Sequence, residues 1–246
     1  MENMNNSVIF ILPNGEEIKE LTEKEQSIFN QSNIKIEGNN NTIKMKISKR
    51  EDIETILLNK GFIIFNYGNN NTINLGNICY HFNPILGIKG LNIIIGNDVD
   101  PFLDPGNKKY ASNCNITIGD DTLFCGVTLY LQDDNTYISI GKKCMFSWGI
   151  DVWCTDAHTI TDMDGNVTNY GKSIEIGDHV WVGKDCKIGK NTKISSDSIV
   201  AWNSVVNKKF DESNVIIAGN PATIVKRNIN WDARDIQNYN LSRANG

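Results

Sequence analysis

Residues 174–206 of the chain read IEIGDHVWVGKDCKIGKNTKISSDSIVAWNSVV. Every sixth residue in this stretch is a β-branched aliphatic one, at positions Ile176, Val182, Ile188, Ile194, Val200 and Val206. The residue after each aliphatic one is small, as at Gly177 and Gly183, and the fifth of each unit is small or β-branched, as at Val180 and Cys186. A period of six matches neither the α-helix nor the alternation of a simple strand. The stretch therefore predicts a repeating solenoid.

In such a solenoid each six-residue unit supplies one short strand and one corner. Three units close a triangular coil, and successive coils stack through parallel hydrogen bonds. The aliphatic residue and the small fifth residue would point into the prism, and Gly and Asn would occupy the corners. The same register occurs upstream at Ile118-Gly119 and Ile140-Gly141. We therefore predict an all-β-dominated fold built on a triangular parallel β-helix.

The sequence divides into three regions. We expect a mixed α/β region of unknown role over residues 1–90 and the β-helix domain over 91–224. Within that domain, polar and Gly-containing sequence predicts an extruded loop at 157–173. A C-terminal tail or short helix is expected over 225–246, because Pro221 ends the regular repeats.

The N-terminal region carries helix signals and a repeated motif. Thr22 to Glu25 and Ser48 to Glu51 both match the capping box, and Gly61 stands where the second helix would end. Gly-Asn-Asn-Asn-Thr-Ile occurs at both 38–43 and 68–73 and predicts tight turns. The two turns fit either solenoid coils or two similar hairpins, and we favour the coils.

The composition excludes several classes of protein. The chain has 246 residues, of which 40% are hydrophobic and 22% charged, so it is neither disordered nor a membrane protein by composition. A net charge of −5 argues against a nucleic-acid partner, and no apolar run is long enough for a transmembrane segment. The N-terminus makes a poor secretory signal, and the six cysteines contain no C-x-x-C pair. We expect reduced thiols and a cytoplasmic location.

Three stretches carry a family resemblance: Ile174 to Gly189, Val200 to Lys208, and Ala218-Gly-Asn-Pro-Ala222. In these the chain resembles the hexapeptide-repeat acyltransferases. Thr155-Asp-Ala-His158, with the loop that follows, is similar to the bacterial capsule and lipopolysaccharide O-acetyltransferases, including those of polysialic acid. The resemblance implies a left-handed β-helix, acetyl-CoA as co-substrate without a metal, a carbohydrate acceptor, and a homotrimer with its site at the subunit interface.

His158 is the candidate general base among the three histidines His81, His158 and His179. It opens the loop that interrupts the repeats, and protruding loops tend to carry function. An imidazole can accept a proton near neutral pH, which suits deprotonation of a hydroxyl. The residues alone leave His158 open between a base and a surface residue, and the resemblance places the catalytic histidine here. Asp156 would orient His158, bind the acceptor or cap its own turn.

The resemblance also implies a substrate-binding set. Trp181 should lie on an outer face, near the thioester and the acceptor or at the trimer interface. Residues implied to bind acetyl-CoA are Trp181, Gly183, Lys184, Ala201, Trp202, Asn207, Lys208, Lys226 and Arg227. Trp202 departs from the small residue common in the family, so the local fit of the cofactor is expected to differ.

Direct transfer to a hydroxyl of a surface glycan or its sugar precursor is the expected reaction. A covalent route through Cys154 is disfavoured, because that residue sits in a strand-like stretch. The spacing of the histidines argues against a zinc site of the γ-carbonic-anhydrase kind. Two alternatives stay open: an N-acetyltransferase acting on a nucleotide-linked amino sugar, and a non-catalytic solenoid that binds a glycan or a partner.

Overall fold

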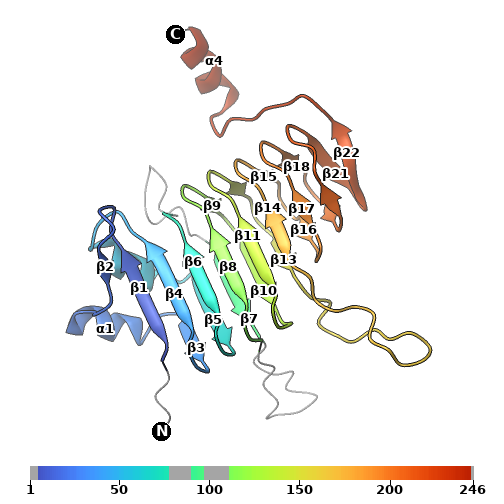
Figure 1. Cartoon of the computed structure of the whole chain (residues 1–246). Coiled ribbons are helices and arrows are strands. Elements are labelled where there is room, and N and C mark those ends of the chain that lie inside the picture. Colours follow the sequence, from blue (N-terminus) through green and yellow to red (C-terminus); the bar gives the residue numbers. More distant parts are fainter. Residues whose placement is uncertain (1–4, 78–89, 97–110, 245–246) are drawn as a thin grey trace.

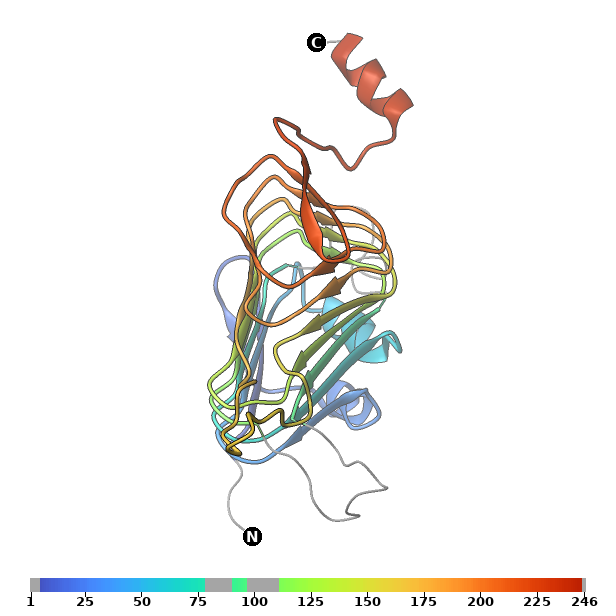
Figure 2. The same ribbon diagram turned by 90° about the vertical axis from the view of Figure 1, so that its right-hand side faces the viewer.

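The computed structural model describes residues 5–77, 90–96 and 111–244. These residues form a triangular prism with strands stacked along its axis in three β-sheets, here called A, B and C, of which sheet C begins only at β9 (Leu123–Phe124) (Figure 1). Figure 2, turned by 90°, shows the stacked coils and the two N-terminal helices to one side. The core is a continuous column of buried aliphatic and aromatic side chains inside the prism.

Sheet A has the strand order β2 (Glu17–Ile18), β1 (Ser7–Ile11), β4 (Thr42–Lys46), β6 (Thr72–Leu75), β8 (Asn115–Ile118), β11 (Tyr137–Ile140), β14 (Ile174–Ile176), β17 (Lys193–Ile194) and β20 (Lys209–Phe210). Sheet B has the order β19 (Val205–Val206), β16 (Lys187–Ile188), β13 (Ile150–Trp153), β10 (Val127–Leu131), β7 (Leu91–Ile95), β5 (Phe62–Tyr67) and β3 (Ile34–Glu37). Sheet C has the order β22 (Ala222–Lys226), β21 (Ile216–Gly219), β18 (Ile199–Val200), β15 (Trp181–Val182), β12 (Met145–Phe146) and β9 (Leu123–Phe124).

The later coils repeat one path through the three sheets. The chain passes from sheet A to C to B, as in β14, β15 and β16, and then returns to A one coil further on. Strands one coil apart pair in parallel, so that Glu175 of β14 lies between Ser139 of β11 and Lys193 of β17. We call the three turns of a coil the A–C, C–B and B–A corners. The parallel β-helix predicted from the six-residue period is confirmed.

Each position of the six-residue unit has the environment that its residue type requires. The aliphatic residues and the fifth residues of residues 174–206 are all buried, with Val182 and Val180 both at 0% exposure. The fourth residue of each unit turns the corner in the left-handed region, with φ between 54° and 62°, at His179, Asp185, Asn191, Asp197 and Asn203. Asn and Asp tolerate this conformation better than most residues, which explains why they recur with the period.

The boundary predicted at residue 90 is not a structural boundary. β6 pairs with β8 in sheet A, and β5 pairs with β7 in sheet B, so both sheets run from the N-terminal region into the later coils. The helices α1 (Glu23–Phe29) and α2 (Asp52–Leu58) each connect a sheet A strand to a sheet B strand, where a sheet C strand stands in later coils. The composition of residues 1–90 looked mixed because helices replace the third side of the same prism.

The two Asn-rich motifs form corners of stacked coils, which confirms the solenoid interpretation over the hairpins. Asn40 donates to the side-chain oxygen of Asn70 at 3.3 Å, Asn70 to Asn113 at 3.2 Å, and Asn113 to Asn135 at 3.2 Å. All four residues have φ between 57° and 59°. A ladder of one residue per coil therefore holds the B–A corner of the early coils in register.

The helix-end predictions were right at one helix and wrong at the other. Thr22 caps α1 in a full capping box with Glu25. Ser48 does not cap α2, because the carboxylate of Asp52 accepts its backbone N–H at 3.0 Å instead. Gly61 does not end α2 either, since the helix ends at Leu58.

The C-terminal region is part strand and part helix. β22 pairs antiparallel with β21 and closes the end of sheet C. The helix α4 (Ile236–Ala244) projects away from the prism (Figure 1) and buries none of its residues. The expected helix is present, but it does not pack on the solenoid, because its apolar residues Ile236 and Leu241 stay exposed. Among the described residues, no helix is long and apolar enough to cross a membrane.

Candidate active site

The loop that carries His158 leaves the prism at the B–A corner. β13 ends at Trp153, and the coil resumes with β14 at Ile174, so the insertion spans 154–173, close to the predicted loop. A single antiparallel bridge between Thr161 and Val167 makes its outer part a hairpin-like arm (Figure 1). Met163 at the tip is fully exposed, and Tyr170 is 69% exposed.

His158 borders a hollow of about 190 Å³ at the base of this arm. The hollow is lined by Asp133, Thr155, Ala157, His158, Thr159, Val167, Asn169 and Tyr170. The main chain of His158 is held on both sides: its N–H donates to the Asp156 carbonyl at 2.7 Å, and its carbonyl accepts from the Asn169 side chain at 2.8 Å. Within the described residues no hydrogen bond engages the imidazole, so the exposed ring is available to a substrate.

Asp156 supports the loop rather than the imidazole. Its carboxylate accepts from the Lys190 ammonium at 2.5 Å and from the Asn169 side chain at 2.9 Å. The Lys190 ammonium holds the pKa of this carboxyl below its usual range. Since Asn169 also bonds the His158 carbonyl, a chain of contacts runs from the next coil through Asp156 and Asn169 to the backbone of His158.

Sequence reasoning missed Lys190 and Asn169. Lys190 lies at the B–A corner of the following coil, and Asn169 lies at the far end of the loop. Neither residue carries a motif of its own, and only the stacking of coils brings them to Asp156. A charged residue directly after a glycine corner, as in Gly189-Lys190, was the one available signal.

Trp181 lies on a different side of the prism from His158. It begins β15 in sheet C and points outward, half-buried, while its neighbour Val182 points into the core. Its partners in register are Met145 on one side and Ile199 on the other. One chain therefore does not bring Trp181 into the hollow at His158.

Four of the residues implied to bind acetyl-CoA meet at the C–B corner. A Cβ on Gly183 would lie 2.5 Å from Cδ1 of Trp202, so the indole packs directly on the glycine. Trp202 is 67% exposed. Lys184 and Ala201 belong to the same two turns of chain. The corner thus presents a flat aromatic surface with an ammonium group beside it, which suits a thin, anionic substrate arm.

The other four lie elsewhere in the chain. Asn207 and Lys208 form the last B–A corner. Lys226 ends β22 on the A–C side, where it pairs with Ile216, and Arg227 follows it. Arg227 forms an ion pair with Glu212 at 2.9 Å. A single chain therefore distributes the expected cationic residues over all three corners.

The positions of the described cysteines and histidines argue against a covalent cysteine route and against a zinc site shared by His158 and His179. Cys154 is fully buried, and burial raises the pKa of its thiol, so a thiolate nucleophile is not favoured there. Burial likewise raises the pKa of the Cys144 thiol to about 12. His158 is at a B–A corner and His179 at an A–C corner, so these two do not share a zinc site. His81 lies outside the described residues.

Comparison with known proteins agrees with this fold. The chain is 35% identical over 149 residues to the polysialic acid O-acetyltransferase of Neisseria meningitidis, a match that covers 59% of this chain and 64% of that enzyme. It is 39% identical over 185 residues to an uncharacterized 24.8 kDa protein in the cps region of Klebsiella pneumoniae, covering 74% of this chain and 78% of the relative. No model of a known protein family matches.

Two solved structures share the fold over most of their length. The polysialic acid O-acetyltransferase OatWY aligns with a TM-score of 0.59 at 27% identity, covering 85% of each chain. The polySia-specific acetyltransferase NeuO aligns with a TM-score of 0.55 at 20% identity, covering 97% of this chain and 95% of its own. The fold is thus the left-handed parallel β-helix. The chain belongs to the hexapeptide-repeat acetyltransferase family.

Proposed function

We propose that the protein transfers an acetyl group from acetyl-CoA to a hydroxyl of a bacterial surface glycan or of its sugar precursor. His158 takes the proton of the acceptor hydroxyl as the oxygen bonds to the acetyl carbonyl carbon. The carbon–sulfur bond then breaks, and the imidazolium returns the proton to the leaving thiolate. A backbone N–H would hold the developing oxyanion.

The observation that carries this proposal is the setting of His158. Its ring is exposed beside a hollow at the break in the hexad array, while its backbone is fastened by Asp156 and Asn169. This arrangement fixes the backbone from which the base projects and leaves the ring open to substrate. In this proposal Asp156 is a positioning residue that acts through the loop.

We further propose a homotrimer with the site between neighbouring subunits. His158 and Trp181 are on different sides of one prism, so a shared site needs the Trp181 face of one copy against the loop of another. The arm also exposes apolar side chains, with Ile160 at 55% and Met163 at 101% exposure. Apolar groups that are exposed on a projecting arm favour contact with a second copy.

Acetyl-CoA would bind along the C–B corner. Gly183 leaves room for Trp202 to lie flat, and Lys184 would meet a phosphate there, with Asn207, Lys208, Lys226 and Arg227 completing the groove across the subunit boundary. The thioester supplies the activated acetyl group. A cytoplasmic location is part of the proposal, and the free thiols of Cys114, Cys144 and Cys186 fit a reducing compartment.

The test is thiol release from acetyl-CoA with a panel of acceptors: sialic acid polymers, other capsular glycans, free sugars, and nucleotide-linked amino sugars. Turnover that requires a sugar hydroxyl supports the proposal, and turnover only with the amines would favour the N-acetyltransferase. Light scattering on the same sample measures the assembly. A monomer in solution would reject the site between subunits. The absence of both turnover and coenzyme A binding would reject the proposal that the protein is an acetyltransferase.

A further inference from the structure

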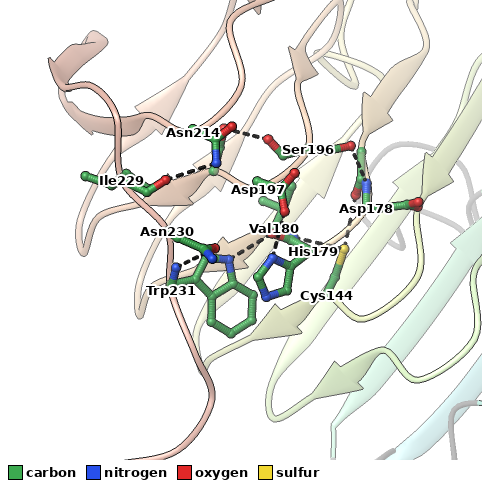
Figure 3. A network of polar contacts seen from close by, with 12 residues as sticks. Cys144, Asp178, His179, Val180, Ser196, Asp197, Asn214, Ile229, Asn230 and Trp231 are labelled. Atoms are coloured by element: carbon green, nitrogen blue, oxygen red, sulfur yellow. Dashed lines mark hydrogen bonds and ion pairs between the residues drawn. The ribbon is translucent and has the colours of Figure 1, made fainter. Parts of the chain in front are cut away.

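The segment 228–232, which we call the strap, connects β22 to α4 and returns to the prism at the A–C corner (Figure 3). The backbone N–H of Ile229 donates to the Asn214 carbonyl at 3.0 Å, and the Asn214 side chain donates to the Ile229 carbonyl at 3.0 Å. These two bonds fix the strap just before Trp231.

Trp231 is held to His179 by two contacts, and His179 is itself held by a third. The two rings stack with centroids 4.2 Å apart and planes 11° apart. The indole N–H of Trp231 donates to the His179 carbonyl at 2.8 Å. Nδ1 of His179 lies 2.9 Å from the carboxylate of Asp197, one coil further on, which fixes the ring on which Trp231 stacks (Figure 3).

Trp231 also meets Trp181. Their ring centroids are 6.0 Å apart at an interplanar angle of 44°, within the range of favourable aromatic pairs. Trp181 is half-buried although it lies on the outside of sheet C, whereas the outward Trp202 of the next turn is 67% exposed. The strap thus places an aromatic ring beside Trp181, the side chain that the family resemblance puts near the acceptor.

We propose that Trp231 is a positioning residue that holds the Trp181 indole in place for the acceptor sugar. This inference rests on the proposed function. A freely rotating indole on a flat β-face loses rotamer freedom when a sugar binds to it, and the contact with Trp231 removes that cost in advance. In this proposal, β15 and the strap together form the face of sheet C that binds the acceptor.

α4 lies outside the stacked rings, although its Ile236 and Tyr239 line a hollow of about 380 Å³ together with Trp231. It buries none of its residues, and Tyr239 contacts Arg234 on the tail itself, 5.3 Å from guanidinium carbon to ring centroid. A chain that ends at Asp235 keeps Trp231 and loses α4. This shortened chain, and Tyr239→Ala in the full chain, are the matched controls for any effect of disturbing the tail.

The experiment is steady-state kinetics of the full trimer with Trp231→Ala, Trp231→Phe, Trp181→Ala and the double variant Trp231→Ala/Trp181→Ala. For Trp231→Ala we expect KM for the glycan acceptor to rise roughly two- to tenfold, the range for an aromatic pair, with kcat and the KM for acetyl-CoA within about twofold. Trp231→Phe keeps a stacked ring and should restore most of the affinity. In the Trp181→Ala background, Trp231→Ala should add nothing further, because it acts through Trp181.

Near-UV circular dichroism of the same variants provides a readout without acceptor. Trp231→Ala should reduce the tryptophan signal with Tm unchanged, and both controls should match the wild type. Wild-type kinetics in Trp231→Ala, a gain of activity, or effects additive with Trp181→Ala would overturn the inference while leaving the proposed function standing. If the wild-type protein showed no acetyl transfer, the proposed function would be rejected instead. The dichroism would then still test the inference, because an unchanged tryptophan signal in Trp231→Ala would reject the contact between Trp231 and Trp181.

Discussion

The early and late coils build the same prism in two different ways. In the late coils, strands of two residues alternate with corners in the left-handed region, and an aliphatic residue enters the core every six positions. In the early coils the parallel strands of sheets A and B are four to six residues long, and α1 and α2 stand in place of sheet C. Side chains of Asn stack at the early corner, with Asn71 completely buried.

The early coils and the late coils therefore differ in whether they carry candidate functional residues. The residues with candidate functional roles belong to the late coils, the loop that interrupts them and the C-terminal strap, and their side chains lie outside the core. The early coils bury amide side chains such as that of Asn71, whereas residues 174–206 bury only the small hydroxyl groups of Thr192, Ser198 and Ser204. Substitutions in the two halves should therefore have effects of different kinds.

The largest effect is expected from His158→Ala in the late half. Removing the imidazole that we propose as general base should lower kcat/KM by about two to four orders of magnitude. The ring is exposed, so Tm should stay within the error of the wild type. Thiol release with acetyl-CoA and the preferred acceptor measures the first quantity, and thermal unfolding the second. A rate equal to the wild type would remove His158 from the mechanism.

The next effect is expected from Asn71→Ala in the early half. The Asn71 side chain donates to the Ala111 carbonyl at 2.8 Å and accepts from the Cys114 backbone N–H at 2.9 Å. Its loss leaves both groups buried and unpaired, which should destabilise the early coils by roughly 2–5 kcal/mol. Urea unfolding and hydrogen exchange at the Cys114 amide measure this loss.

Asn70→Gly is the matched control for that variant. Asn70 is an exposed member of the other ladder with φ of 57°, a conformation that glycine adopts readily. Its effect should stay within about 0.5 kcal/mol. Equal losses of unfolding free energy in the two variants would show that burial does not distinguish the two Asn ladders. A changed acetyl-transfer mechanism in Asn71→Ala would show that the early coils also affect the chemistry.

A smaller effect is expected from Gly183→Ala at the C–B corner. The new methyl group would lie 2.5 Å from the Trp202 ring and displace the indole. KM for acetyl-CoA should rise about three- to tenfold, the value of one lost aromatic contact. Gly189→Ala has the same place in its hexad, but its Cβ would lie 3.7 Å from the nearest atom, the Val206 carbonyl oxygen, so it should bind acetyl-CoA normally. Similar KM values for both variants would place acetyl-CoA elsewhere.

The smallest effect is expected from Asp156→Asn. The Lys190 ammonium lowers the folded-state pKa of Asp156, so the ion pair stabilises the fold at pH values above the unfolded-state pKa of about 3.9, and this contribution disappears as the pH falls through the lower folded-state value. Because the Asp156 side chain is 38% exposed, we expect a difference of only about 0.2–1 kcal/mol at pH 7.

Unfolding of wild type and Asp156→Asn between pH 7 and pH 2 measures this difference, with Asp164→Asn at the tip of the arm as control. A difference that grew as the pH fell would contradict the assignment of the ion pair. The variant should also retain far more activity than His158→Ala, because the carboxylate does not touch the imidazole.

The structure could be predicted from the sequence where a local structural requirement selects one type of residue. The aliphatic period at Ile176 to Val206 needs only that each unit place one side chain inside, so the prism could be predicted from spacing. The break in that period located the loop of His158. The same reasoning failed at residue 90, because helices that replace a sheet hide the continuity of the other two sheets.

The chain by itself determined the coil, its corners and the place where the coil is interrupted, since a strand and a turn are set by residues within six positions of each other. The tertiary structure decided which distant residues meet: Lys190 with Asp156, Asn71 with Cys114, and Trp231 with His179. These contacts depend on the number of residues in each coil and on where the C-terminal tail returns to the prism. A local sequence pattern does not encode them, because the sequence separation of the residues that stacking brings together differs at every corner.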